Sequence, residues 1–404
     1  MCQCFATGSG SGWIGALRGK IMKRFHSFVF GLVLCCGAAA AAERMPVATK
    51  FLFWTPAEQA LGYKNIEKIF PTRVIKRGGA VRELPVTGKP FDVSYAFQGK
   101  TWNTDAFMKA ADTSGLLVVK DGKIVLERYA LGRKANERWT SFSVAKSVTS
   151  TLVGAAIKDG SIKSLDSDVT DYLPELKKTA YDGVTVRDLI TMRSGVAWNE
   201  DYIDPKSDVN SFAFQPKPKD GGNPVVAFMA KHPRAHKPGT TFHYDTGETD
   251  LAGILVARAT HMTLSDYASK AVWSKIGMEQ DGVWMLDQAG VELGGCCISM
   301  TLRDYARFGL FFMDGGKGVL PEGWVKEASS KQVQSDFMNL GYGYFWWIHN
   351  DGTYEAVGIF GQSIFIDPKA HLVIVTNSAW PEADATPRYS VYDAYISAVR
   401  KALH

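Results

Sequence analysis

Residues 140–147 read Thr-Ser-Phe-Ser-Val-Ala-Lys-Ser and contain the only Ser-x-x-Lys pattern in the 404-residue chain. Residues three apart on a helix project from the same face, so Ser143 and Lys146 are predicted to lie side by side. Thr140 and Ser141 are predicted N-caps of a buried helix that contains the apolar run 144–157. Ser143 would then lie in its first turn, where free backbone N–H groups favour an oxyanion.

The pairing of these two residue types indicates nucleophilic catalysis. A lysine held away from water loses proton affinity through desolvation, and it can then accept the proton of a neighbouring serine. The stretch therefore predicts a serine acyl-transfer enzyme.

Composition limits the class of protein. With 46% apolar and 22% charged residues, the chain is predicted to be globular, with one large domain or two interleaved domains. The net charge is +5, but residues 1–42 hold four cations and no acid, so the rest is nearly neutral. No basic stripe remains, and nucleic-acid binding is not expected.

Residues 1–42 have the features of an N-terminal extension followed by a signal peptide. A basic region begins at Met22, an apolar core spans 28–36, and the alanines at 38–42 precede a cleavage site before Glu43. The apolar run is too short for a membrane span. We therefore predict a periplasmic or secreted protein whose translation starts at Met1 or at Met22.

Two pairs of neighbouring cysteines each allow two interpretations. A lipid anchor on Cys35 or Cys36 is the less favoured alternative to cleavage, because Leu34 stands where small residues are usual. In the mature chain only Cys296 and Cys297 remain. They are predicted to be packed thiols, with a strained vicinal disulfide as the alternative. Two such ligands do not build a zinc site, so no metal and no cofactor are predicted.

The rest of the chain divides into three regions. Residues 43–160 comprise a lead-in segment, a β-hairpin at 115–129 with an Asp-Gly turn, and the catalytic helix. Residues 161–290 are predicted to be mostly helical. Residues 291–404 hold antiparallel strands and a closing helix, and complete the sheet region. The strands are predicted at 342–348, 353–359, 362–366 and 371–376, and helices at 184–192, 246–260, 265–276, 300–313 and 389–403. This order predicts an α+β fold of the α/β-sandwich type, in which helices flank a central antiparallel sheet that a mostly helical region interrupts in sequence.

A long loop at 199–222 is predicted to form an active-site wall, because long structured loops are often functional. Asp201, Tyr202 and Asp204 lie in this loop and are candidates for substrate contact. Trp346 and Trp347 are predicted to split, one into the core and the other toward solvent or the cleft.

A second candidate stretch is His243-Tyr244-Asp245-Thr246-Gly247, which precedes a predicted helix. A tyrosine there can place its hydroxyl in a cleft, where near a Ser–Lys pair it can relay a proton to the leaving group. The alternative is a core tyrosine with a satisfied hydroxyl.

The third stretch is Gly358-Ile359-Phe360-Gly361-Gln362, between two predicted strands. Gly361 would allow close approach of substrate, and the N–H of Gln362 would form an oxyanion hole with the N–H of Ser143. A plain glycine bulge is the alternative.

Together the three stretches resemble the serine β-lactamase and penicillin-binding-protein superfamily. The likeness covers roughly residues 110–400 and is greatest to the class C β-lactamase-related hydrolases, a group that includes esterases and 6-aminohexanoate-dimer hydrolases. The resemblance implies a β-lactamase/transpeptidase-like fold with Ser143 as nucleophile, Lys146 as its base and Tyr244 as the proton-relaying acid.

The chain departs from the family pattern at two places. Thr246 stands where the family has Asn or Ser, and it keeps a hydroxyl. Ile359-Phe360 stand where β-lactamases have the Lys-Thr of K-T-G, and an apolar pair cannot make the charge-assisted bond to a substrate carboxylate. Phe360, Gly361, Thr246 and Tyr202 are the predicted substrate-binding residues.

We therefore expect an exported serine hydrolase that forms an acyl-enzyme on Ser143 and hydrolyses a small-molecule ester or amide, and that is not a proficient β-lactamase. One alternative is a D-amino-acid peptidase, a carboxypeptidase or a weak β-lactamase acting on cell-wall peptides. The other is a non-catalytic binding protein on the same fold. The oligomeric state stays open.

Overall fold

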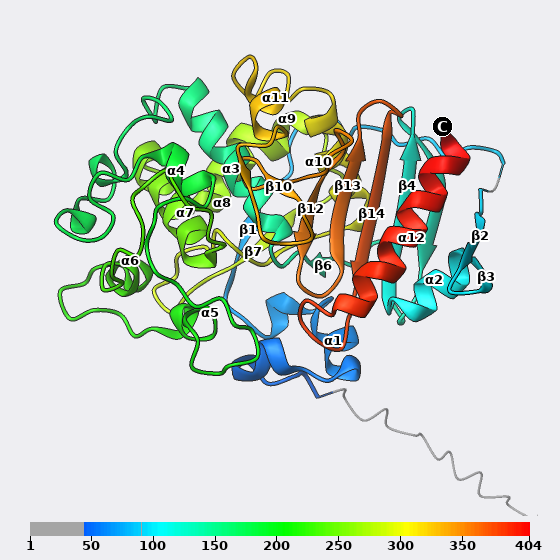
Figure 1. The fold of residues 1–404 in the computed structure, drawn as a ribbon, viewed down its shortest axis with the longest axis horizontal. Coiled ribbons are helices and arrows are strands. Elements are labelled where there is room, and N and C mark those ends of the chain that lie inside the picture. The colour runs from blue at the N-terminus through cyan, green and yellow to red at the C-terminus, as the bar shows by residue number, and fades with distance from the viewer. Residues whose placement is uncertain (1–43, 90) are drawn as a thin grey trace, which may run out of the picture. The chain divides into compact units, whose positions relative to one another are not determined.

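The computed structural model describes residues 44–89 and 91–404, and residues 44–404 form one compact unit. The predicted signal peptide therefore lies outside the described residues. An eight-stranded sheet crosses the unit in the order β5-β4-β14-β13-β12-β11-β10-β9, and neighbouring strands pair antiparallel (Figure 1). Its strands are β4 (Thr113–Lys120), β5 (Lys123–Tyr129), β9 (Val333–Gln334), β10 (Gly341–Tyr342), β11 (Trp347–Ile348), β12 (Tyr354–Gly358), β13 (Gln362–Asp367) and β14 (Leu372–Ser378).

The N-terminal hairpin and the C-terminal strands meet inside this sheet. Strand β4 pairs with β14, so segments more than 200 residues apart in sequence lie side by side. Asp121 and Gly122 both adopt positive φ angles, 50° and 75°, as the turn of a tight hairpin requires. The prediction of a central antiparallel sheet interrupted in sequence by a helical region is confirmed.

Helices cover both faces of the sheet. Helix α10 (Leu302–Met313) lies on one face, where Gly309 approaches Ile364 and Val373. Helix α12 (Thr386–Leu403) lies on the other, where the Tyr392 and Ser363 hydroxyls are 2.6 Å apart. The central strands are therefore buried on both sides, which explains their continuous apolar sequences.

The remaining helices lie around this frame. They are α1 (Pro56–Gly62), α2 (Thr104–Ala110), α3 (Val144–Lys158), α4 (Val186–Ile190), α5 (Asp208–Ser211), α6 (Pro224–Met229), α7 (Thr246–Thr260), α8 (Leu264–Ala268), α9 (Ser274–Ile276) and α11 (Trp324–Ala328). Short 3₁₀ segments at Ala48–Phe53, Ile66–Lys68, Val169–Asp171, Pro174–Leu176 and Phe212–Phe214, and a π-helical turn at Ser269–Trp273, connect them. Helix α3 packs along α7 and against strands β12 and β13.

The structure adds a second sheet that the sequence did not predict. Its order is β1-β7-β8-β6, and a separate two-stranded hairpin joins β2 to β3. The strands are β1 (Thr72–Ile75), β2 (Ser94–Phe97), β3 (Lys100–Asn103), β6 (Trp139–Thr140), β7 (Gly282–Met285) and β8 (Ile298–Met300). These strands are only two to four residues long, too short to show a period in sequence.

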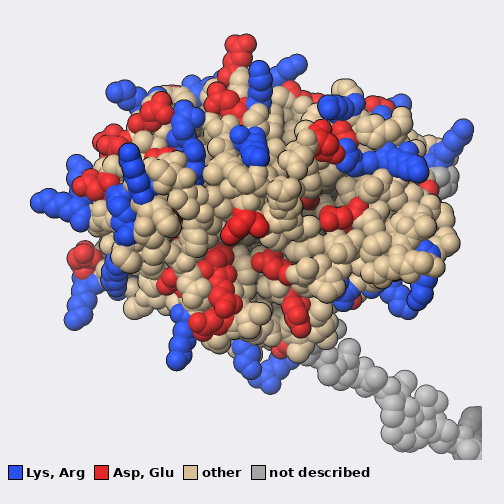
Figure 2. Space-filling model, in the orientation of Figure 1, with Lys and Arg blue, Asp and Glu red and all other residues tan. Residues whose placement is uncertain are grey.

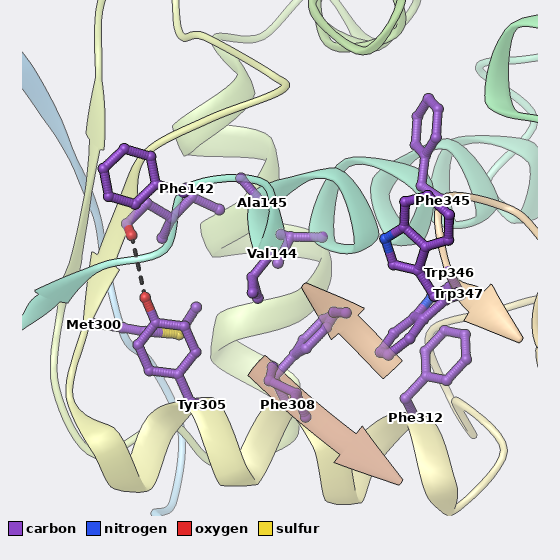
Figure 3. Close-up of a cluster of buried hydrophobic side chains, with 14 of the residues drawn as sticks. Phe142, Val144, Ala145, Met300, Tyr305, Phe308, Phe312, Phe345, Trp346 and Trp347 are labelled. Atoms are coloured by element: carbon purple, nitrogen blue, oxygen red, sulfur yellow. Dashed lines mark hydrogen bonds between the residues drawn. The ribbon is translucent and has the colours of Figure 1, made fainter. Parts of the chain in front are cut away.

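One predicted strand is divided. Residues 342–348 form β10, a turn and β11, because the chain folds back and the Gly343 N–H donates to the Trp346 carbonyl (2.8 Å). Phe345 adopts a φ of 58°, and its N–H donates to the Ile190 carbonyl outside the sheet. The two tryptophans split as predicted. Trp346 is fully buried with Phe308 and Phe312 of α10 (Figure 3), whereas Trp347 lines a cleft.

Candidate active site

The first turn of α3 presents Ser143 to a cavity. Ser143 is itself the N-cap of α3, so the predicted caps Thr140 and Ser141 are wrong. Thr140 belongs to β6, and the Ser141 hydroxyl accepts the Ile298 N–H (3.0 Å) and so fastens β8 to the turn. The carbonyl of Ser143 starts the helix, and its side chain makes no capping bond. Ser143 thus lies beside the free N–H groups of the helix start, and its hydroxyl makes no hydrogen bond to them.

A strained residue holds this turn. Phe142 has a φ of 43°, a conformation that costs on the order of 1–3 kcal/mol for a residue with a Cβ. Its ring packs against Phe51 and Phe360, with centroids 5.0 and 4.9 Å away. Figure 3 shows Phe142 beside the start of α3, among the buried side chains of this cluster. Buried aromatic packing therefore offsets the strain that aims Ser143 into the cavity.

Lys146 is buried directly behind the serine. Its Nζ donates to the Ser143 Oγ (3.2 Å), the Thr246 Oγ1 (2.9 Å) and the Gly295 carbonyl (3.1 Å). Desolvation lowers the pKa of Lys146, and the negative charges of Glu200, Asp250 and Asp245 partly oppose that shift. A neutral amine within reach of the serine hydroxyl is suited to accept its proton.

Tyr244, in contrast to Lys146, lies in surroundings that favour its protonated form. It precedes α7, whose N-cap Asp245 accepts the Glu248 N–H (3.0 Å), and its ring stacks on Trp347 with centroids 5.7 Å apart. The Nζ of Lys146 lies 5.1 Å from the centre of the Tyr244 ring. Burial raises the pKa of Tyr244 well above its usual 10, and the nearby Ser143 hydroxyl works in the other direction. Tyr244 therefore keeps its proton and is suited to donate it, while Lys146 is suited to take one.

Glu200 joins these residues, and sequence reasoning missed it. Its carboxylate accepts the Tyr202 hydroxyl (2.6 Å), the Thr246 N–H (3.0 Å), the Thr246 hydroxyl and the Trp198 indole N–H. The Thr246 hydroxyl in turn accepts a hydrogen bond from the Lys146 Nζ, so a chain of hydrogen bonds runs from Ser143 to the loop 199–222. The only sequence signal was the position of Glu200 two residues before Tyr202. Thr246 and Tyr202, predicted to bind substrate, both belong to this network and also line a cavity.

Three buried carboxylates lie along the N-terminal part of α7. Asp245, Glu248 and Asp250 are each about 1% exposed. Burial raises the pKa of Asp250 to about 7, although the charge of Lys146 opposes the shift, and burial raises that of Glu248 to about 8. The Asp250 Oδ1 accepts the Gly295 N–H (3.3 Å), and the Gly295 carbonyl accepts Lys146. This arrangement fixes the peptide that holds the lysine.

The strand turn after β12 differs from its prediction. Gly361 was predicted to allow close approach of substrate, whereas the glycine that packs against the turn before α3 is Gly358: a Cβ there would lie 2.7 Å from the Ser141 carbonyl oxygen. Gly361 (φ 84°) instead abuts Trp380, and Gln362 is a fully buried member of the β12–β13 ladder. Ile359 lines both cavities at the site, whereas Gln362 lines neither.

Phe360, which was predicted to bind substrate, lies in the core instead. Its side chain is 0% exposed and packs against Tyr63 and Phe142. Neither Phe360 nor Gly361 lines the two cavities beside Ser143. The sequence alone does not distinguish the two glycines, because both flank the same apolar turn.

Two cavities lie beside Ser143 and Tyr244. An apolar cavity of about 170 Å³ is lined by Ser143, Thr246, Cys296 and side chains from the 3₁₀ segment at 48–53 and from the loop around α5. A second cleft of about 430 Å³ contains Tyr244 and four carboxylates. Tyr202 and Ile359 belong to both walls. Figure 2 shows acidic residues gathered around a hollow in the middle of one face.

The cysteine prediction is corrected. The structure joins Cys296 and Cys297 in a vicinal disulfide, the alternative to the predicted packed thiols. The pair directly follows Gly295, and Cys296 lies on the wall of the apolar cavity.

Two histidines near the site contact neighbouring residues. His243 contacts the Trp198 carbonyl (2.8 Å) and His232 pairs with Asp208 (3.2 Å). Within residues 44–404, apart from Pro90, no group of three or more His, Cys, Asp or Glu residues is arranged to hold a metal ion. None of the helices described is long and apolar enough to cross a membrane.

Comparison with known proteins shows which family the sequence matches. Residues 103–393 match the Beta-lactamase family. The chain is 27% identical to the 6-aminohexanoate-dimer hydrolase of Paenarthrobacter ureafaciens over 359 residues, which are 84% of this chain and 90% of that protein. It is 24% identical over 185 residues to a β-lactamase of Pseudomonas fluorescens, covering 43% of this chain and 47% of that one.

Solved structures show the same fold. A candidate 6-aminohexanoate-dimer hydrolase from Bacillus anthracis superimposes with a TM-score of 0.73 at 24% identity, over 84% of this chain and 93% of that chain. A penicillin-binding protein from Bacillus halodurans superimposes with a TM-score of 0.59 at 18% identity, over 72% and 98%. Because the family match spans most of the chain, the protein belongs to the Beta-lactamase family and is a serine hydrolase of the β-lactamase/penicillin-binding-protein fold.

Proposed function

We propose that the protein hydrolyses a small-molecule amide or ester through an acyl-enzyme on Ser143. The observation that carries the proposal is the contact between the buried Lys146 Nζ and the Ser143 Oγ (3.2 Å), together with the lowered pKa of that lysine. The similarity to a 6-aminohexanoate-dimer hydrolase over most of both chains supports an amide substrate.

Each residue has a distinct role in the proposed reaction. Neutral Lys146 takes the Ser143 proton as Oγ attacks the carbonyl carbon, and the carbonyl becomes an oxyanion. We assign the oxyanion hole to the N–H groups of Ser143 and Ile359, in place of the predicted Gln362, because Ile359 lines the cavity that Ser143 faces. As the tetrahedral intermediate collapses and the C–N or C–O bond breaks, Tyr244 protonates the departing amine or alcohol, and the Lys146 ammonium then returns a proton to Tyr244. Water attacks the acyl-enzyme and returns free Ser143 and the acid.

Efficient β-lactam hydrolysis is not expected. The residues before Gly358 are Ala356 and Val357, and those before Gly361 are Ile359 and Phe360. With either glycine in the family position, the strand lacks the cation and hydroxyl that would bind a substrate carboxylate. Export is also part of the proposal and rests on the signal-like residues 22–42.

The test is intact-mass spectrometry after incubation with a fluorophosphonate, with Ser143→Ala beside the wild type. Ser150→Ala is the matched control, because Ser150 lies on the same helix and its hydroxyl bonds only to the Ser147 carbonyl (3.1 Å). A single adduct on wild type and Ser150→Ala, and none on Ser143→Ala, is expected. Absence of any adduct would favour a binding protein, and rapid turnover of a chromogenic cephalosporin would favour the cell-wall peptidase or β-lactamase alternative.

A further inference from the structure

The position of Tyr244 indicates which of the two cavities holds each half of the substrate. Tyr244 lines the larger cleft and not the apolar cavity, whereas Ser143 lines the apolar cavity. In the proposed reaction Tyr244 protonates the leaving group, so the leaving group lies in the larger cleft. The acyl group, which stays on Ser143, then occupies the apolar cavity.

The acyl side holds no charge. Its walls comprise aromatic and aliphatic side chains with a few neutral polar groups, and none of the described residues that line it is Asp, Glu, Lys, Arg or His. A charged acyl group would lose its hydration there without a partner, which costs several kcal/mol for an ion. An uncharged acyl chain meets no such penalty.

The leaving-group side has the opposite character. Glu200, Asp201, Asp336 and Asp384 line it, and no cationic side chain from residues 44–89 or 91–404 does. Neither Asp336 nor Asp384 forms an ion pair with a described residue. The Asp384 N–H donates to the Ile359 carbonyl (3.0 Å), which holds this acid close to the reacting centre.

Aromatic rings complete the cleft. Phe242, Phe337, Trp347 and Tyr389 line it beside the carboxylates, and Trp347 stacks on Tyr244. Aromatic faces attract organic cations, and carboxylates add a direct charge. Although Asp384 is open to the cleft, nearby protein raises its pKa to about 6 by desolvation, and the Glu200 charge adds to the effect. A bound cation would offset the electrostatic repulsion between the Asp384 and Glu200 carboxylates.

We propose that the enzyme selects amides or esters in which an uncharged acyl group is joined to a leaving group that carries an ammonium ion, the class of N-acylated diamines and acylated amino alcohols. This assignment rests on the proposed function, because Tyr244 defines the leaving-group side. The linear 6-aminohexanoate dimer carries the reverse pattern, with ammonium on its acyl half and carboxylate on its leaving half.

A matched panel tests the assignment. Hexanoyl amides of 1,6-diaminohexane, hexylamine and 6-aminohexanoate share one acyl group and differ in the charge of the leaving group, and the corresponding hexanoyl esters extend the panel. We expect kcat/KM to fall in the order cationic, neutral, anionic, with about tenfold or more between the extremes at low salt and a smaller ratio at high salt. Replacing hexanoyl by 6-ammoniohexanoyl should lower kcat/KM further.

Variants connect the preference to the cleft. Asp384→Asn and Asp336→Asn should each reduce the cationic-to-anionic ratio severalfold, whereas Asp105→Asn, which removes the same charge from α2, should leave the ratio as in wild type. Equal rates for the three leaving groups, or a preference for the anionic one, would overturn the assignment while Ser143-dependent turnover upholds the proposed function.

A second measurement applies if the panel turns over too slowly. 1,6-Diaminohexane should protect Ser143 from the fluorophosphonate at concentrations where hexane-1,6-diol does not, and Asp384→Asn should weaken that protection. Equal protection by the two compounds, or none by either, would overturn the assignment. Loss of labelling itself would instead refute the proposed function.

Discussion

The two walls of the active site were built in different ways. The wall at α3 is one helical turn, in which Ser143 and Lys146 lie three residues apart and touch at 3.2 Å. The facing wall collects Glu200 and Tyr202 from a loop, Tyr244 from the start of α7 and Ile359 from a strand turn. Local spacing fixes the first wall, while tertiary packing fixes the second. The Ser143–Lys146 pair can therefore be predicted from the sequence, whereas the residues that contact it from other elements cannot.

Removing the base from the local wall should have the largest effect. Lys146→Ala is expected to lower kcat by about a thousandfold or more, because it removes the amine that contacts the Ser143 hydroxyl. Lys158→Ala, at the far end of the same helix, is the control. Fluorophosphonate labelling rates and turnover would measure both, and near-wild-type labelling of Lys146→Ala would move the base to the facing wall.

On the facing wall, Tyr244→Phe should have the next largest effect. We expect kcat for an amide to fall about a hundredfold, and that for an ester with an acidic phenol leaving group much less, because only the amine must be protonated to depart. Tyr172→Phe removes a hydroxyl that accepts the distant Lys163 N–H and controls for the loss. Equal losses for both substrates would contradict the assignment of Tyr244 as the acid.

The substitution Gly358→Ala tests the contact between the two walls. A Cβ there would lie 2.7 Å from the Ser141 carbonyl, so Gly358→Ala should push β12 from the catalytic turn and lower kcat/KM by about tenfold or more. Gly88→Ala adds a Cβ where no atom lies within 4 Å and should be neutral. If Gly361→Ala lowers activity while Gly358→Ala does not, the original glycine assignment stands.

Removing the charge of Glu200 should have the smallest effect and change the pH profile. The Glu200 carboxylate raises the pKa of Lys146 and so partly opposes desolvation. Glu200→Gln keeps an acceptor for Thr246 but removes the charge, so the pKa of Lys146 should fall further. Because neutral Lys146 is the active form, the acidic limb of the kcat/KM profile should move to lower pH, with a roughly tenfold loss of rate from the altered network. A limb that stays in place would show that Glu200 only braces the loop.

Strands and helices with a strong pattern were predictable, and the site-forming connections were less so. Helix α7 has the predicted bounds 246–260, and the hairpin at 115–129 was evident from its Asp-Gly turn. The short strands β1, β6, β7 and β8 were missed because pairing partners far away in sequence stabilise them. Phe360 was misplaced because an apolar residue in a turn is equally compatible with a cavity wall and with the core.

Sequence patterns were sufficient to predict the contact between Ser143 and Lys146, the alternating order of sheet and helices, and the lack of a Lys-Thr pair before Gly358 or Gly361. Each of these depends on neighbours within one element. Tertiary packing was needed to bring Glu200 into the lysine network, to place Gly358 against the Ser141 carbonyl, and to give the two sides of the cleft different charges. Those properties arise where loops from distant parts of the chain meet, and such contacts leave no periodic signal in sequence.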